Sequence, residues 1–347
     1  MSGSVRLTAV WLAVASAMVW TSGCAHPDFG GARGDPGDAL RAEYTGEPGI
    51  NWPYPPEEIE ELFADDDFEI VSAKYAGGGV TGAQKAEIRF PGRDGATLTV
   101  KWKRMPSPRL DGMNNSPRKE MAVYEIQKWF LEPEDYVVPT VGARCIPIKI
   151  ARKFRPEAAP TLPRSRCVLG VAAVWLDGVT VPDAVLDNER FASDTNYAYH
   201  LANFNLLTYL VRHRDGRAGN ILVSKNDENR RVFAVDNGIA FGGLVYNYFV
   251  PNWDRIRVPA LRRDSIERLR EIDRARMDEL GVLASFERVS SGMLRLAPGA
   301  KNLDHTKAVR IHGAQVQLGL TRSEIDGIER RVKHLLRAVD AGEIPVF

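Results

Sequence analysis

The sequence predicts an α+β protein with two lobes, a small antiparallel β lobe that contains one helix and a larger lobe that is mainly helical. Up to position 176, strand-like runs of β-branched and apolar residues are interrupted by a single helical stripe. Beyond it, apolar residues recur at helical spacing, as at Tyr197, Leu201 and Phe204. We assign residues 66–178 to the small lobe and 179–347 to the larger one. With 347 residues, 44% of them hydrophobic, the chain can bury the core of one bilobal domain or two small ones.

The charge balance argues against one class of partner. The 46 basic and 45 acidic residues give a net charge of +1, so the chain has no basic excess with which to bind a nucleic-acid backbone. The six histidines are scattered and lack the spacing of metal ligands. We therefore expect no nucleic-acid partner and no histidine-bound metal.

A glycine-rich loop lies between the first two strand-like runs of the small lobe. The runs cover residues 68–75 and 86–90, and the loop GGGVTG places Gly77, Gly79 and Gly82 in a Gly-x-Gly-x-x-Gly pattern. Glycines at these positions let a backbone approach phosphate groups closely. The alternative is a flexible hairpin loop that binds nothing.

The next strand carries two lysines. Residues 96–103 alternate as a strand does, which places Lys101 and Lys103 on the same face. One of them can hold the phosphates of a nucleotide. We prefer Lys103, which comes last on the strand, and keep Lys101 as the second choice.

A helix with a buried acidic residue follows the lysine strand. Ser116 is suited to the N-cap and Pro117 to the first helical position. Glu120 lies one turn before Val123 on the apolar stripe, and a buried carboxylate needs a partner. We expect Glu120 to pair with Lys103. The alternative is a solvated glutamate in the first turn, favoured by the helix dipole.

The larger lobe contains the most informative stretch, HRDGRAGNILVSKNDENRRVFAVDNGIAFGG. Asp215 is followed five residues later by Asn220, and an apolar run further on ends at Asp236 in Asp-Asn-Gly. Residues 221–223 and 232–235 are expected to form a hairpin. That hairpin would hold Asn220 and Asp236 near each other.

This order of residues is typical of phosphoryl transfer. A nucleoside triphosphate is strongly anionic, so its site holds a divalent cation through oxygen ligands while a separate carboxylate orients the attacking hydroxyl. We assign Asp215 as the base, and Asn220 and Asp236 as ligands of Mg²⁺ or Mn²⁺. Lys103 and Glu120 would position the phosphates of ATP. The alternative is a polar helix end at His-Arg-Asp and a tight Asn-Gly turn.

With these residues in place, the chain resembles the protein-kinase-like superfamily, and within it the atypical secretory-pathway kinases that act in the Golgi lumen. The similar segments are WKRM around Lys103, EMAVYEIQKWFLEPEDYVVPTVGAR from Glu120 onward, and VDNGIAFG around Asp236. The resemblance implies a bilobal kinase-like fold with ATP between the lobes and the backbone of residues 174–176 facing the adenine. It also implies that Glu120 can approach the metal.

The chain departs from conventional protein kinases in two places. Neither Ala-Pro-Glu nor a long activation segment follows Asp236, so control by phosphorylation of such a segment is not expected. Arg217 replaces the lysine that those kinases have two residues after the base, and its guanidinium is suited to the γ-phosphate. The hydroxyl acceptor is unknown. A protein is favoured over a glycan or a lipid, and the alternatives are nucleotidyl transfer on the same fold or a non-catalytic binding module.

The N-terminus predicts export with a lipid anchor. A charged start, an apolar run at residues 7–20 and small residues before Cys24 follow the order of a signal peptide. The end of this segment resembles the lipobox of bacterial lipoproteins. We expect residues 1–23 to be removed, Cys24 to be lipidated, and residues 24–65 to form a flexible tether whose last part can begin a short helix. This places the protein in the cell envelope, at the outer membrane in a Gram-negative cell; plain secretion or an uncleaved anchor are the alternatives.

The cysteine count agrees with export. Once Cys24 is set aside, Cys145 and Cys167 remain as a pair. They begin or adjoin two apolar runs that would face each other in an antiparallel hairpin. We expect a disulfide between them in an oxidising compartment, the alternative being two buried thiols.

Overall fold

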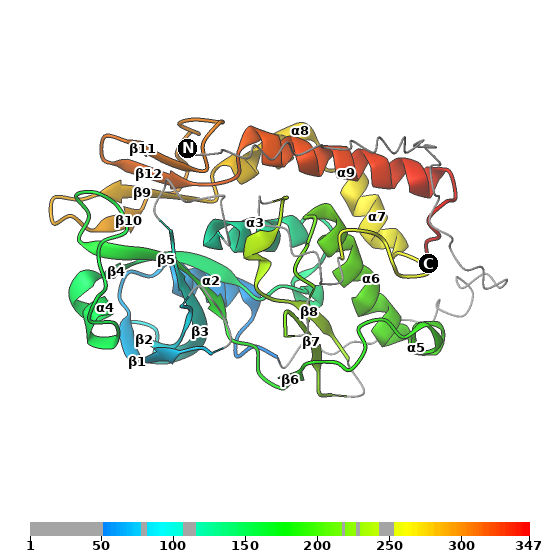
Figure 1. The fold of residues 1–347 in the computed structure, drawn as a ribbon, viewed down its shortest axis with the longest axis horizontal. Helices are drawn as coiled ribbons and strands as arrows, with labels where there is room; N and C mark the ends of the chain where they lie inside the picture. Colours follow the sequence, from blue (N-terminus) through cyan, green and yellow to red (C-terminus); the bar gives the residue numbers. More distant parts are fainter. Residues whose placement is uncertain (1–50, 78–81, 107–115, 217–218, 227–229, 243–252) are drawn as a thin grey trace, which may run out of the picture. The chain divides into compact units, whose positions relative to one another are not determined.

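Strands dominate the first half of the described chain and helices much of the second (Figure 1). The computed structural model describes residues 51–77, 82–106, 116–216, 219–226, 230–242 and 253–347. Several predictions concern positions outside these residues, namely the signal peptide, Cys24 and most of the tether, together with Gly79 and Arg217.

The small lobe is built on a five-stranded sheet in the order β1-β2-β3-β5-β4. All of its neighbouring strands are antiparallel. The strands are β1 (Glu69–Tyr75), β2 (Gln84–Phe90), β3 (Ala96–Arg104), β4 (Val141–Pro147) and β5 (Cys167–Val174). Strand β3 is the middle strand of this sheet, and its two lysines lie where the small lobe meets the larger one.

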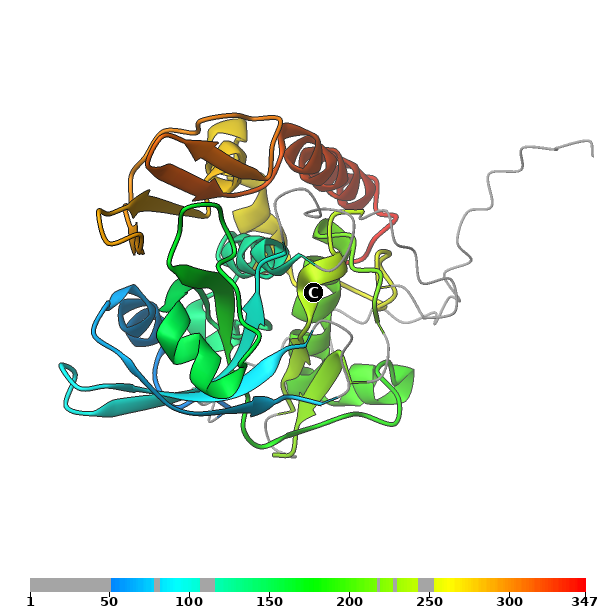
Figure 2. The ribbon, with the colours of Figure 1, turned by 60° about the vertical axis from the view of Figure 1, so that its left-hand side comes forward.

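Both faces of this sheet are covered, which is why every residue of β5 is buried. Side chains alternate along a strand, so Val168 and Ala172 join the core under α2 (Pro56–Ala64). Leu169 joins the second core, which is continuous with α3 (Pro117–Gln127). In Figures 1 and 2, α3 lies between strands β1–β3 and the elements of the larger lobe.

The predicted tether reaches too far toward the C-terminus. The helix α2 belongs to the small lobe, because Ile59, Leu62 and Phe63 are at most 3% exposed and pack on the sheet. Their spacing makes one apolar stripe along the helix. Because the segment as a whole is acidic, its composition indicated a tether and not a helix packed on the sheet. Asn51 also exchanges backbone and side-chain hydrogen bonds with Asp177.

A disulfide joins Cys145 on β4 to Cys167 on β5, with a Cα–Cα distance of 5.4 Å. The two strands form the antiparallel hairpin that the sequence predicts. Their connection contains α4 (Ile148–Phe154). The crosslink therefore closes the base of a long insertion at one edge of the sheet.

The larger lobe contains helices and two small sheets. The sheets have the orders β6-β7-β8 and β10-β9-β12-β11. The helices are α5 (Asn188–Ser193), α6 (Thr195–Leu210), α7 (Arg263–Arg270), α8 (Arg274–Asp278) and α9 (Arg322–Asp340). The strands are β6 (Val179–Thr180), β7 (Ile221–Ser224), β8 (Val232–Ala234), β9 (Ala284–Arg288), β10 (Leu294–Leu296), β11 (Val309–His312) and β12 (Gln315–Leu318).

The four-stranded sheet of the larger lobe was not foreseen from the sequence. Its strands are only three to five residues long, too short for a clear alternation of apolar and polar residues. Among the described residues, no helix has the length and apolar character needed to cross a bilayer.

Candidate active site

Strand β3 directs its lysines and its apolar residues to opposite sides. Val100 and Trp102 are buried in the core under α2. Lys101 and Lys103, which alternate with them, face the other way and reach toward the larger lobe. The prediction that both lysines share one face of the strand is therefore confirmed, and the structure shows that this face meets the larger lobe.

Helix α3 brings Glu120 to the same place. Ser116 occupies the N-cap position and Pro117 begins the helix, as predicted, although the Ser116 side chain makes no capping bond. The Ser116 backbone N–H instead donates to the Gly238 carbonyl oxygen at 3.0 Å. The start of α3 is thereby attached to the Asp-Asn-Gly loop of the larger lobe.

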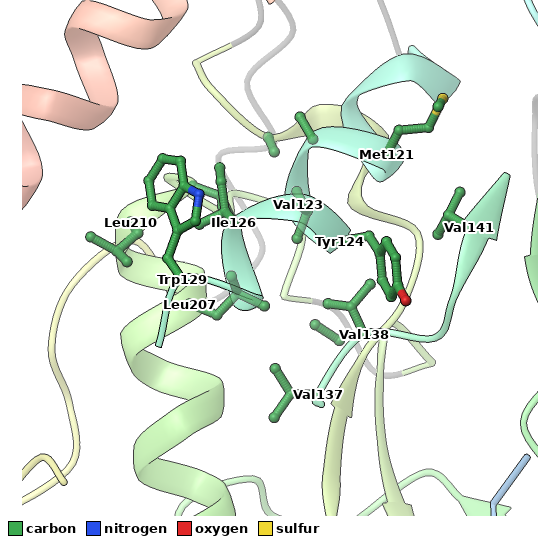
Figure 3. Close-up of a cluster of buried hydrophobic side chains, with 14 of the residues drawn as sticks. Met121, Val123, Tyr124, Ile126, Trp129, Val137, Val138, Val141, Leu207 and Leu210 are labelled. Atoms are coloured by element: carbon green, nitrogen blue, oxygen red, sulfur yellow. The ribbon is translucent and has the colours of Figure 1, made fainter. Parts of the chain in front are cut away.

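The apolar face of α3 fixes the helix within one core shared by both lobes. Figure 3 shows Val123 and Ile126 of α3 close to Leu207 and Leu210 of α6, with Val141 of β4 on the other side. The helix cannot rotate without opening this core. The position of Glu120 is therefore set by packing, before any ligand is considered.

Lys103, Glu120 and Asp236 form a buried ion cluster. The Lys103 Nζ donates to Glu120 Oε1 and to Asp236 Oδ1, which confirms the predicted pairing of Lys103 with Glu120. Burial alone would lower the pKa of the Lys103 ammonium, but the two carboxylates outweigh it and raise that pKa. Lys103 is therefore held in its charged form.

Asp236 is approached by a second lysine that the sequence analysis kept only as an alternative. The Lys101 Nζ lies 3.1 Å from Asp236 Oδ2. Asp236 itself has φ 62° and ψ 50°, the left-handed region that most residues avoid and aspartate tolerates better than most. Asp236 lies two residues after the end of β8, and its carboxylate contacts both lysines of the small lobe.

The hairpin of β7 and β8 holds the remaining predicted residues near Asp236. The Val235 N–H donates to the Asn220 carbonyl oxygen at 2.9 Å, next to Asp236 in sequence. The Asn220 Nδ2 donates to the Asp215 carbonyl oxygen at 3.0 Å, and both residues are buried. Because its amide nitrogen is used, Asn220 has its amide oxygen to offer a cation. Asp215, Asn220 and Asp236 are thus gathered at one place, and their roles in catalysis stay predictions.

His213 begins the segment that carries Asp215 and is fully buried. Within the described residues, neither of its ring nitrogens has a hydrogen-bond partner. Burial lowers the pKa of His213 to about 4, against the smaller opposing effects of Asp236 and Asp254. His213 is therefore neutral at physiological pH and supports the loop by packing.

The glycine loop is described only at its ends. Gly77 has φ 78° and Gly82 has φ 64°, both in the region that favours glycine. The Gly82 backbone lies beside the Arg155 guanidinium. These ends are compatible with a phosphate-binding loop, which stays a prediction.

A cavity of about 250 Å³ opens beside the ion cluster. Its walls are mostly apolar and one end is charged, the combination expected of a small-molecule site. It is lined by residues of both lobes: Lys101, Glu120, Val138, Pro139, Val141, Ala173, Val174, Trp175, Leu176, Val179, Gly219, Leu222, Val235, Asp236 and Asn237. Val138 and Pro139 lie in a segment that carries the resemblance, but the sequence analysis gave them no role, and only the fold brings them to the cavity.

The connection between the lobes offers one backbone donor to this cavity. The Val174 N–H donates to Thr140 O at 3.0 Å and the Trp175 N–H to Thr99 O at 2.8 Å. In the part of the chain that is described, the Leu176 N–H has no acceptor. The sequence analysis predicted that the backbone of residues 174–176 faces the adenine. Within that segment, Leu176 is therefore the residue whose N–H can donate a hydrogen bond to it.

The donor set fits a hard divalent cation. No group of three or more His, Cys, Asp or Glu side chains suited to a metal occurs among the described residues. Mg²⁺ is usually held by one or two carboxylates together with phosphate oxygens and water. Asp236 and the Asn220 amide oxygen match that pattern, with a nucleotide supplying the other ligands.

The chain is similar to a number of solved structures, among them the following three. The structure of hydra Fam20 with a sugar aligns with a TM-score of 0.51 at 15% identity, covering 88% of this chain and 94% of that one. A Golgi casein kinase with Mn and ADP bound aligns with a TM-score of 0.43 at 12% identity, covering 84% and 78%. A further Golgi casein kinase structure gives 0.45 at 12%, covering 84% and 77%. No family model and no curated protein matches the chain.

The fold assignment rests on the hydra protein, the one of the three with a TM-score above 0.5. Together with the antiparallel small-lobe sheet, the helix α3 and the helical larger lobe, it shows that the chain has a bilobal, protein-kinase-like fold. This confirms the predicted fold class. At this level of identity the likeness concerns the fold alone.

Proposed function

We propose that the protein is a phosphotransferase that uses ATP and a divalent metal, Mg²⁺ or Mn²⁺, to phosphorylate a hydroxyl group. The observation that carries this proposal is the buried cluster of Lys103, Glu120 and Asp236 at the charged end of an apolar cavity between the lobes. Each lobe supplies part of the cluster, so the cluster exists only when the lobes are assembled. Ligand phosphates placed there would meet fixed charges that need no reorganisation.

In this proposal, each residue of the site has a separate role in binding or catalysis. Asp236 and the Asn220 amide oxygen would hold the cation, which when bound would neutralise charge on the phosphates. Lys103, oriented by Glu120, binds phosphate oxygens. The apolar wall accepts the base, and the Leu176 N–H donates a hydrogen bond to its edge. Asp215 accepts the proton of the attacking hydroxyl as the new oxygen–phosphorus bond forms and the bond from the γ-phosphorus to the departing ADP breaks.

The acceptor in this proposal is a protein hydroxyl, with a sugar hydroxyl as the alternative. The hydra structure was solved with a sugar, so glycans belong among the acceptors to be tested. Incubating the protein with ATP, Mn²⁺ and envelope proteins or glycans, followed by mass spectrometry of the products, identifies the acceptor. The mass added distinguishes phosphate from a nucleotidyl group, and no addition to any acceptor favours a binding module.

Two variants test the assignment of roles. Asp215→Ala should still bind Mn²⁺ and nucleotide but lose transfer by a factor on the order of 10² to 10⁴. Asp236→Ala should lose metal-dependent nucleotide binding as well as transfer. Undiminished transfer by both variants would falsify the proposal, because the two segments would then be only a helix end and a turn.

We also propose that the protein is lipid-anchored in the cell envelope through Cys24. The signal-peptide pattern of residues 1–23 supports this, as does the Cys145–Cys167 disulfide, since such bonds persist in oxidising compartments. Mass spectrometry of the mature protein should find a lipid-modified N-terminal Cys24. Cys24→Ser should accumulate as the uncleaved precursor, and a wild-type chain recovered unprocessed and unlipidated in the cytosol would contradict the anchor.

A further inference from the structure

The Asp236 carboxylate is occupied on both oxygens by lysines of one strand. Lys103 bonds to Oδ1, and the Lys101 Nζ lies 3.1 Å from Oδ2. These are the same oxygens that a divalent cation would use. A cation and the two ammonium groups therefore compete for a single carboxylate.

The two lysines are not equivalent. Lys103 has a side chain only 5% exposed and a second carboxylate partner in Glu120, so it stays paired when it leaves Asp236. The Lys101 side chain is 25% exposed and lines the cavity. Among the described residues, Asp236 is its one ion-pair partner. A cation bound to Asp236 would thus release Lys101 into the cavity, where a charged group needs a new counter-ion.

We propose that Lys101, which pairs with Asp236, is a second phosphate-binding lysine that exchanges this carboxylate for a nucleotide phosphate when a metal binds Asp236. This rests on the proposed function. Alternate residues of a strand lie roughly 7 Å apart, so the released ammonium groups of Lys101 and Lys103 can contact different phosphate oxygens. The exchange keeps every buried charge paired in both states.

Lys101 should therefore have opposite effects on two binding reactions. For Mn²⁺ alone it is a competitor, so Lys101→Ala should bind Mn²⁺ several-fold more tightly than the wild type. For ADP with saturating Mn²⁺ it is a ligand, so the same variant should bind about tenfold or more weakly, the loss expected for one charge-assisted hydrogen bond. Lys101→Arg, which keeps the charge, should recover most of the nucleotide affinity.

Calorimetric titration of the full chain with Mn²⁺, and then with ADP, measures both effects. Lys74→Ala is the matched control, because Lys74 is an exposed lysine of the same sheet and its loss changes the net charge equally. It should leave both affinities unchanged.

The outcomes separate this inference from the proposed function. Wild-type protein that binds no ADP with Mn²⁺ overturns both. Wild-type binding together with unchanged affinities of Lys101→Ala overturns only the role of Lys101. Weaker binding of both Mn²⁺ and ADP by Lys101→Ala also overturns it, since a residue that merely supports the fold would impair the two reactions alike.

Discussion

Helix α3 carries two buried ion pairs, two residues apart, that differ in what surrounds them. Glu120, 5% exposed, pairs with Lys103 at the edge of the cavity. Arg118, 1% exposed, makes two bonds of 3.0 Å to Glu324 at the start of α9, and a third of 3.2 Å to the Gly319 carbonyl. The first pair adjoins space for a ligand, and the second is enclosed by protein.

A buried charge therefore does not by itself indicate an active site. Arg118 attaches α3 to the larger lobe, and Lys119 does the same through a 2.7 Å bond from its Nζ to the Ala240 carbonyl. Glu120, the next residue, contacts Lys103 of the small lobe instead. The helix is thus bonded to both lobes.

Of the two ion pairs of α3, the one that faces the cavity should have the larger effect on activity. Glu120→Gln should reduce phosphotransfer by a factor on the order of 10² to 10³, because Lys103 loses the charge that orients it. Stability should change less, since Lys103 keeps Asp236 as a partner. Steady-state kinetics and urea unfolding of the same preparation measure the two quantities. A Glu120→Gln variant that unfolds easily but retains full specific activity would show that the Lys103–Glu120 pair serves stability and not activity.

The enclosed pair should show the reverse pattern. Arg118→Met should lower the free energy of unfolding by roughly 3 kcal/mol, because it leaves Glu324 partly buried without its cation. This loss of stability is expected to be at the low end of what breaking a buried ion pair costs, because Glu324 keeps its capping bonds to Thr321.

Urea unfolding measures this loss, and an exposed arginine–glutamate pair supplies the control. Arg89 and Glu69 are both about half exposed, so Arg89→Met should destabilise the protein far less than Arg118→Met does. Equal losses in Arg118→Met and Arg89→Met would show that burial of the α3 pair has no energetic consequence.

The disulfide gives a stabilising link that is remote from both ion pairs. Its two cysteines are 22 residues apart, and closing a loop of this size stabilises by about 2 to 4 kcal/mol in the chain-entropy view. Cys145→Ala with Cys167→Ala should therefore lower the unfolding midpoint while metal and nucleotide affinities stay unchanged. Rapid alkylation of both thiols in the folded, unreduced wild-type protein would show that the bond is not formed.

The smallest effect is expected at His213, a buried group that stays neutral at physiological pH. Its pKa falls from 6.5 to about 4 on folding, so between these values the unfolded chain binds more protons and stability decreases as pH falls. At pH 5.5 the loss relative to pH 7.5 should be about 1 kcal/mol. His213→Gln should remove this part of the pH dependence; an unchanged difference between the two pH values would assign it to other groups.

Local patterns determined much of this protein. Alternation along residues 96–103 placed Lys101 and Lys103 on one face, and the apolar stripe of the next helix made Glu120 a buried carboxylate in need of a cation. The hairpin that holds Asn220 near Asp236 follows from two short apolar runs and the turn between them. Such features depend on neighbours a few residues apart, which a sequence displays directly.

Tertiary structure decided the contacts between distant segments. Arg118 and Glu324 are 206 residues apart, and no periodicity indicates that α9 would approach α3. The same holds for Val138 and Pro139 in the cavity wall and for the second lysine on Asp236, where the sequence could only rank Lys101 behind Lys103. Periodicity assigns a side chain to a face of its own element, whereas the partner across that face is set by how the lobes pack.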